Sequence, residues 1–187
     1  MALTTVNTTA LSGTITNAQL AGSIDLTAKV TGTLPTGNGG TGRTAVTGNV
    51  LQVLQANSST ADAKTANSYA DITGLSQAIT PSSTSSKVLV MGKVNVLVTG
   101  GGADVGARVQ PVRDSTVLAA EYSEVYISDA GAADPGEIAE MSIFYLDSPN
   151  TTSAVTYKFQ GKVPSGGTAT FQFDNKYSTI TVMEIAG

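Results

Sequence analysis

The stretch KVLVMGKVNVLV, residues 87–98, is a long run of β-branched and aliphatic residues. Its polar residues are few, and three consecutive glycines follow it at residues 100–102. β-Branched side chains favour the extended backbone of a strand, and clustered glycines end a strand. The stretch therefore predicts a long β-strand.

Shorter segments of the same kind lie on both sides of this strand, separated by turn residues and without helical patterns between them. The further strands that we predict span residues 49–55, 69–72, 107–112, 116–127, 138–146, 155–163, 168–173 and 179–185. Many short strands at such spacing predict an all-β fold, an antiparallel β-sandwich or jelly roll. We expect its core to contain Phe159, Phe171 and Phe173 together with Val94, Val96, Phe144, Ile180 and Val182.

The composition divides the chain into two unlike parts. All ten aromatic residues lie at or beyond Tyr69, and the only charged residues among the first 60 are Asp25, Lys29 and Arg43. Because aromatic side chains dominate core burial, the first part cannot easily build a core of its own. We predict an extended N-terminal arm over residues 1–47 and a β-sandwich domain over residues 48–187.

The arm is expected to depend on other chains. Residues 31–48 contain six glycines and Pro35, a composition that excludes a stable helix or a regular sheet. In an isolated monomer such a segment would be a disordered linker, whereas contacts with other chains would order it. Aliphatic residues recur in the arm at spacings of four to six, and we predict that they contact other subunits: Leu11, Ile15, Leu20, Ile24, Val30 and Leu34. The turn from the arm to the domain is predicted at Gly37, Asn38, Gly39, Gly40 and Gly42.

The residue types that are missing exclude several kinds of chemistry. The 187 residues include no cysteine, histidine or tryptophan. Without thiols and imidazoles there is no disulfide, no Ser-His-Asp triad and no ordinary zinc site. The net charge of -4 argues against a nucleic-acid partner. The start lacks the pattern of a signal peptide, and no apolar run approaches the ~20 residues of a membrane span. We therefore expect a protein that is not an enzyme, has no cofactor and does not enter a membrane.

Acidic residues gather in one part of the chain. Between Asp114 and Tyr157 lie eight acidic residues and no basic ones. Residues 129–137 could offer oxygen ligands to calcium, although their spacing matches no EF-hand. Glu121, Glu124 and Glu137 could supply the paired carboxylates of a glycosidase, but nothing fixes their separation. The favoured interpretation is a solvated acidic face that keeps particles soluble and mutually repelling.

The segment LPTGNGGTG, residues 34–42, resembles the LP-x-x-NGGTG element common in bacteriophage tail-fibre and virion-surface proteins. Residues 15–24 are similar to the repeats that often precede this element. Residues 48–53, 69–75 and 79–90 are similar to a β-rich domain at the ends of phage structural proteins. The resemblance implies a homotrimer that is made in the host bacterial cytoplasm and built into the virion surface.

The size of the chain favours a position on the capsid over one on the tail. The chain has no long shaft and no separate tail-adaptor domain, so a short arm followed by one β-domain fits a capsid-decorating (cement) protein. The arm would anchor it to the major capsid protein and stabilise the head. The alternative is a short tail fibre or receptor-binding tip joined to tail proteins, whose loops at residues 100–106, 128–136 and 148–152 would contact host surface glycans. A third class, a carbohydrate-cleaving enzyme, is disfavoured because no acid pair can be identified.

Overall fold

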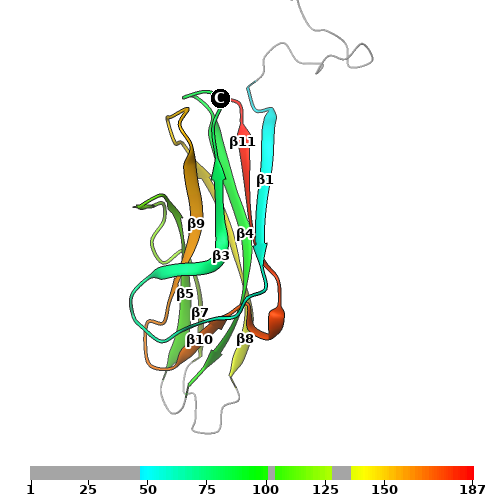
Figure 1. Ribbon diagram of the computed structural model, residues 1–187. Helices are drawn as coiled ribbons and strands as arrows, with labels where there is room; N and C mark the ends of the chain where they lie inside the picture. The colour runs from blue at the N-terminus through cyan, green and yellow to red at the C-terminus, as the bar shows by residue number, and fades with distance from the viewer. Residues whose placement is uncertain (1–46, 101–103, 128–135) are drawn as a thin grey trace, which may run out of the picture. The chain divides into compact units, whose positions relative to one another are not determined.

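The computed structural model describes residues 47–100, 104–127 and 136–187. These residues form two antiparallel β-sheets that pack face to face, so the predicted antiparallel sandwich is confirmed (Figure 1). The predicted arm, residues 1–47, lies outside the described residues except for Thr47, and the boundary at residue 48 stays a prediction. No helix among the described residues has the length and apolar character that crossing a membrane requires.

Sheet A has six strands, and β4 (Lys87–Thr99) is at its centre. One side of β4 pairs along its whole length with β8 (Glu137–Asp147). Its other side pairs first with β11 (Ser178–Ile185) and then with β10 (Thr168–Phe171). The remaining strands complete the sheet, with β1 (Val50–Ser58) on β11 and β2 (Asp62–Lys64) on β10.

Sheet B has five strands, and its centre is formed by β9 (Val155–Lys162) and β5 (Val105–Arg113). On one edge lies β3 (Ala70–Ile79), and on the other β5 pairs with β6 (Thr116–Val117) and β7 (Ser123–Ile127). The chain crosses repeatedly between the sheets, because β3, β5 and β9 each lie in sheet B between strands of sheet A. Contacts distant in sequence therefore hold the sandwich together.

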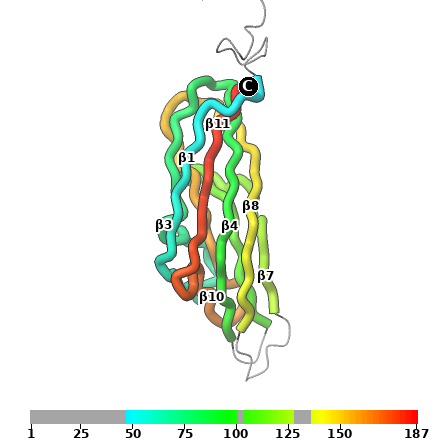
Figure 2. Tube along the Cα trace, turned by 90° about the vertical axis from the view of Figure 1, so that its right-hand side faces the viewer, coloured from blue at the N-terminus to red at the C-terminus, as the bar shows by residue number. Residues whose placement is uncertain are grey.

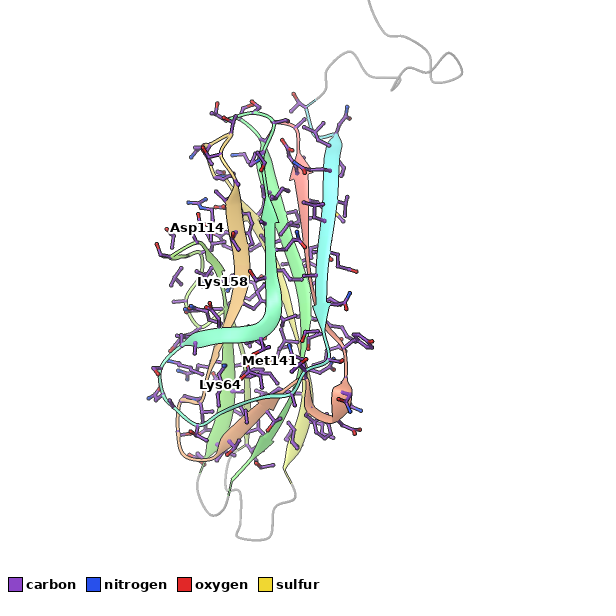
Figure 3. The ribbon with its side chains drawn as sticks, viewed as in Figure 1. Lys64, Asp114, Met141 and Lys158 are labelled. Atoms are coloured by element: carbon purple, nitrogen blue, oxygen red, sulfur yellow. The ribbon has the colours of Figure 1, made fainter. Side chains whose placement is uncertain are left out.

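The core forms because the inward side of each long strand is mostly apolar. Along β4, Val88, Val90, Val94, Val96 and Val98 point inward and are fully buried. Position 92 of the same inward series is glycine, and a Cβ there would lie 2.3 Å from the Phe159 ring. The missing side chain thus makes room for a large aromatic ring from sheet B. Figure 3 shows the inward side chains of the sandwich, with Met141 of β8 among them.

The expected core is correct in most positions and wrong in two. Phe159, Phe171, Val94, Val96, Ile180 and Val182 are fully buried as predicted. Phe144 instead points outward from β8 and is 61% exposed, because Met141 and Ile143 occupy the inward positions of that strand. Phe173 is half-buried because β10 ends at Phe171, and residue 173 starts a 3-10 turn, η4 (Phe173–Asn175).

Two strand predictions need correction. The predicted strand at residues 116–127 is broken into β6 and β7, because the chain turns between them and Glu121 has a φ of 50°. Strand β3 extends beyond the predicted residues 69–72 and bends at Gly74, whose φ is 77°. A Cβ at Gly74 would lie 2.6 Å from that of Ser58, so glycine suits this close approach of β3 to the end of β1.

Candidate interaction surface

The outer face of sheet A carries aliphatic and aromatic side chains where a solvated sheet would carry polar ones. Strand β4 alternates two mostly apolar series, one inward and one outward, and its neighbours add outward apolar residues at one end of the sheet. We define the apolar face as the outward apolar side chains of β1, β11, β4 and β8, namely Val50, Val53, Leu89, Met91, Phe144, Leu146, Met183 and Ile185. Figure 2 looks onto these four strands, which lie side by side in the order β1, β11, β4, β8.

Strand register aligns the apolar face into rows. Val53 pairs with Met183, Met183 with Leu89, and Leu89 with Leu146, so four apolar residues cross four strands at one height. The next row begins with Phe144 of β8 and Met91 of β4 and continues with the polar Thr181 of β11 and Gln55 of β1. On a β-sheet, side chains that are directly opposite lie about 4.5–5.5 Å apart at Cβ. The rows therefore form one contiguous apolar surface.

Exposure is greatest on the two flanking strands. Val53 on β1 is 52% exposed, and Phe144 and Leu146 on β8 are 61% and 55% exposed. Leu89 and Met183 on the central strands are half-buried by their neighbours. The Tyr122 hydroxyl donates a hydrogen bond to the Phe144 carbonyl and thereby holds the outer edge of β8. The backbone that presents Phe144 is thus fixed although its ring is exposed.

Polar residues bound the apolar face toward the other end of the strands. The next row is Asn57, Thr179, Lys93 and Ser142. Lys93 forms an ion pair with Glu140, the following outward residue of β8. Asn95 donates a hydrogen bond from its side chain to the Tyr177 carbonyl, so the chain between β10 and β11 covers the sheet there. The apolar face therefore occupies the end of sheet A where β1 begins.

Sheet B presents a charged outer face. Arg108 lies between Glu124 and Lys162 in the strand register. Its guanidinium donates to Glu124 at 2.7 Å and to Glu121 at 2.8 Å, and Lys162 donates to Glu121 at 2.9 Å. The bond from Lys162, with help from Arg108, lowers the pKa of Glu121 below its usual value. The Lys162 ammonium also lies 4.7 Å from the centre of the Tyr69 ring.

A second polar row continues this face. Gln110 donates to Gln160 at 3.1 Å, and Gln160 donates to Asp71 at 2.8 Å. Lys158 forms an ion pair with the other oxygen of Asp71 at 2.8 Å. Although burial opposes ionisation of Asp71, the bonds from Lys158 and Gln160 outweigh it and lower the pKa of this carboxyl. The outer face of sheet B is thus a network of charges and amides.

The described acids of residues 114–147 are solvated as predicted, except for the buried Asp147, but the face that they form is not purely acidic. Glu121, Glu124, Glu140 and Asp147 form ion pairs with basic residues from outside that stretch. Asp114 accepts a hydrogen bond from the Thr156 amide at the turn after β5 (Figure 3). The acids are concentrated in sequence but are paired in space. Among the described residues no group of acids is arranged to hold a metal ion.

A buried polar cluster joins the two sheets. Asp147 of β8 accepts hydrogen bonds from Arg113 of β5 at 2.5 Å and from the Tyr157 hydroxyl of β9 at 2.7 Å, both at the same oxygen. Burial, and then the bond to Asp147, raises the pKa of Tyr157 far above its usual value. The hydroxyl therefore stays protonated and serves as a fixed donor. This cluster holds the sheets in register and leaves no free acid-base pair.

Glu184 is a carboxylate on the inward side of β11, and it is fully buried. One oxygen accepts from the Ser82 amide and hydroxyl at 2.7 and 2.6 Å and from the Ser86 hydroxyl at 2.7 Å. The other oxygen accepts from the Gln52 amide at 2.6 Å. Burial alone would raise the pKa of Glu184, but the bonds from Ser82, Gln52 and Ser86 outweigh it and lower the pKa to about 2. The carboxylate ties the segment before β4 to β1 and β11.

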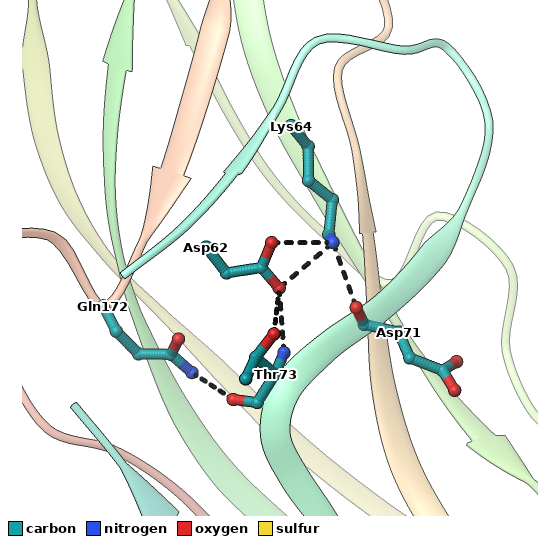
Figure 4. A network of polar contacts seen from close by, with 5 residues as sticks. All are labelled: Asp62, Lys64, Asp71, Thr73 and Gln172. Carbon is teal, nitrogen blue, oxygen red and sulfur yellow. Dashed lines mark hydrogen bonds and ion pairs between the residues drawn. The ribbon is translucent and has the colours of Figure 1, made fainter. Parts of the chain in front are cut away.

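A third cluster fastens the short strand β2 to β3 (Figure 4). Asp62 accepts from the Thr73 amide at 2.8 Å and from its hydroxyl at 3.0 Å. Lys64 pairs with Asp62 at 3.0 Å and donates to the Asp71 carbonyl at 3.0 Å. Gln172 donates to the Thr73 carbonyl at 3.2 Å. These bonds stabilise the bend of β3, although the side-chain oxygen of Gln172 is buried without a hydrogen-bond partner among the described residues.

The predicted contact residues of the arm, from Leu11 to Leu34, and the predicted turn from Gly37 to Gly42 lie outside the described residues and stay predictions. So do Asp129 and Asp134 of the calcium suggestion, and residues 101–103 and 128–135 of the loops expected to contact glycans. The third such loop is described, and its Ser148 accepts a hydrogen bond from Lys87 at 2.7 Å.

Sequence reasoning missed the apolar face itself. The available signal was in β4 and β8, where apolar residues occupy both alternating series. Such a strand is typical of burial on both faces. Counting both series would have pointed to a covered outer face.

No protein-family model matches the chain, and no curated protein matches it. Among solved structures, one of infectious bursal disease virus, Gx strain, is similar with a TM-score of 0.39 at 12% identity, over 74% of this chain and 33% of that chain. A VP2 subviral particle of the same virus gives 0.38 at 10% identity, over 89% and 42%. The Eiger TNF of S. frugiperda gives 0.36 at 7% identity, over 72% and 93%. The chain thus spans about a third of the first of these proteins.

Proposed function

We propose that the protein is a non-enzymatic structural component of a bacteriophage virion, a homotrimeric capsid-decorating protein. Residues 1–47 anchor it to the major capsid protein, and the sandwich projects from the surface. The observation that carries the proposal is the apolar face, a contiguous apolar surface on a sheet with no partner strand or helix over it among the described residues. The largest contiguous apolar patch on a protein surface is often a site of protein contact.

Two further observations support this proposal. The segment at residues 34–42 resembles an element of phage virion-surface proteins. The charged groups of the sandwich are largely engaged with one another, as in the Arg108 network and the Asp147 cluster. Side chains that satisfy one another stabilise a scaffold and leave few groups for chemistry.

The contribution of such a protein is mechanical. Each copy adds contact area across the boundaries between capsid subunits, and a standard interface buries about 1,600 Å². Many identical copies sum to a large effect on the stability of the particle against internal pressure. The arm suits this role, since 47 extended residues reach roughly 150 Å at about 3.3 Å per residue.

Binding to empty capsids tests the proposal. The full chain is mixed with undecorated capsids, and bound protein is measured after sedimentation, beside a variant that lacks residues 1–47. We expect the full chain to bind and the shortened chain to stay in solution with the circular dichroism of a folded β-protein. Normal decoration by the shortened chain would show that the arm is not the anchor.

Copy number separates the decorating protein from the alternative, a short tail fibre or receptor-binding tip. Quantitative mass spectrometry of purified virions gives the ratio of this chain to the major capsid protein. Hundreds of copies per virion support decoration. A few to a few tens of copies support the fibre, and host surface glycans then become the expected partner.

A further inference from the structure

We propose that the apolar face is the surface through which three copies of this chain pack around a common axis that runs along the strands. Strand β1 of each copy lies against β8 of the next. The inference deepens the proposed function, since it rests on the homotrimer and names the surface that forms it.

The arrangement of exposure across the face points to this packing. The most exposed apolar side chains of the face are not at the centre of the sheet but on its two flanking strands, and they include Val53 on β1 and Leu146 on β8. These two residues stand at the same height, because the register joins them through Met183 and Leu89. Rotation about an axis along the strands therefore brings Val53 of one copy to Leu146 of the next without a shift along the strands.

A contact between two different edges is heterologous, and heterologous contacts form closed rings when the rotation closes. The apolar face fits such a ring because both of its edges are apolar at one height. The central side chains Leu89 and Met183 then face the axis. A different protein would need its own matching row, whereas a second copy provides one.

Charge also favours a copy of this chain over a membrane surface. Two basic residues accompany the apolar face on sheet A, Lys87 and Lys93. Lys93 is paired with Glu140, and Lys87 donates to Ser148. Attachment to anionic lipids depends on clusters of four to eight unpaired basic residues. The neutral, mixed border of the face suits a copy that carries the same residues.

The apolar face is smaller than the area that each partner buries in a standard interface. Four strands about 4.8 Å apart and three outward rows about 7 Å apart give, with their side chains, roughly 400 Å². A standard interface takes about 800 Å² from each partner. The chain enters β1 at Thr47 and Gly48, where Gly48 donates to the Ala186 carbonyl beside the face. Packing on this face therefore brings the three Thr47–Gly48 segments together, and the remaining contact area has to come from residues outside the face.

The inference is tested by measuring the native mass of variants on the apolar face and of a control variant elsewhere. Light scattering is applied to the full chain, to Leu146→Asp and Val53→Asp on the apolar face, and to Val117→Asp as the control. Val117 lies on β6 of sheet B and is 46% exposed, so its replacement introduces the same charge at a similar exposure away from the face. We expect three times the 18.9 kDa chain mass for the wild type and the control, and a single chain for both face variants at micromolar concentration.

The outcomes separate this inference from the proposed function. If the wild type is trimeric and both face variants remain trimeric, the apolar face is not the interface, while the homotrimer stands. If the wild type is a single chain, both the homotrimer and this interface are wrong, and capsid binding decides the anchoring role alone. Circular dichroism shows whether each variant is folded. If an aspartate variant is unfolded, Leu146→Gln and Val53→Gln replace it, because uncharged glutamine is tolerated on a solvated strand, and persistence of the trimer in both would overturn the inference.

Discussion

On sheet A the row of Val53, Met183, Leu89 and Leu146 crosses four strands without a polar side chain. On sheet B the corresponding outer row is Glu124, Arg108 and Lys162, which is charged throughout. Both rows belong to antiparallel strands of one sandwich, so backbone geometry does not explain the difference. The side chains of sheet B satisfy one another in water, whereas those of sheet A gain only when another surface covers them.

On the inward side of sheet A the relation between polarity and burial is different from that on its outer face, because a charged side chain is buried there. Strand β11 places Met183 and Ile185 outward and the carboxylate of Glu184 inward. That carboxylate is stable because Ser82, Ser86 and Gln52 donate to it. Burial therefore follows the available partners and not polarity alone. The proposed interface concerns only the apolar row of sheet A, because the buried charge of Glu184 already has its donors within the chain.

The largest expected effect on stability comes from replacing Phe159, which lies inside the sandwich, in comparison with Phe144, which lies on its outer face. Phe159→Ala removes a fully buried ring that fills the space over Gly92, and we expect it to lower the free energy of unfolding by about 3–5 kcal/mol. Phe144→Ala removes an exposed ring and should cost under about 1 kcal/mol in a single chain. Urea unfolding in the Leu146→Asp background, where copies are separated, measures both. Equal costs would contradict the assignment of inner and outer sides.

Glu184→Gln tests the buried carboxylate through its dependence on pH. The folded pKa is about 2 against an ordinary value of 4.5, so the carboxylate stabilises the fold fully above about pH 5 and loses its contribution as the pH falls toward 2. We expect the variant to be less stable at pH 7 by on the order of 3 kcal/mol. The difference between wild type and variant in urea unfolding should shrink between pH 5 and pH 2. A difference that stays constant over this range would show that the charge of Glu184 contributes nothing.

Tyr157→Phe is expected to have an intermediate effect on the cluster that joins the sheets. The change removes the hydroxyl that donates to Asp147 at 2.7 Å and leaves the bond from Arg113 in place. A hydrogen bond to a charged group contributes about 1.5–3 kcal/mol, so thermal unfolding should reveal a loss near the lower end of that range. Arg113→Met, which leaves the Asp147 carboxylate buried without its cation, serves as the comparison and should cost more.

Arg108→Met should have the smallest effect on stability. It measures how much the ion pairs on the outer face of sheet B contribute. Arg108 is partly exposed and forms ion pairs with Glu121 and Glu124. Exposed ion pairs contribute under about 1 kcal/mol and are screened by salt. We expect a small loss of stability at low salt, none at 1 M salt, and an unchanged native mass. A change in the native mass of this variant would show that the assembly surface lies on sheet B and not on sheet A.

The sequence predicted the class of fold because strand signals are local. The run at residues 87–98 forms β4, and most of the other described strands overlap the predicted ranges. Which side of a strand faces the core was harder to predict, because β4 and β8 carry apolar residues on both sides. Phe144 was assigned to the core as an aromatic residue, yet its position in the alternation of β8 places it outward.

The sequence did not show which polar side chains bind one another, because the partners are distant along the chain. Glu184 depends on Ser82 and Ser86, which precede it by about a hundred residues. Four of the described acids between residues 114 and 147 are paired with Arg108, Arg113, Lys93 and Lys162, none of which belongs to that stretch. Counting charge along the chain therefore predicted an acidic face where the fold makes ion pairs.

The accessibility of the apolar face in the full-length protein tests the central claim most directly. The chain contains no cysteine, so Leu146→Cys and Val117→Cys each introduce a single thiol, at positions that are 55% and 46% exposed in one chain. If copies cover the apolar face, the thiol at position 146 reacts with a maleimide at least about tenfold more slowly than the one at position 117, and dilution that separates the copies makes the rates equal. Equal rates at micromolar concentration, with the full chain folded, would contradict the claim that this face is an interface.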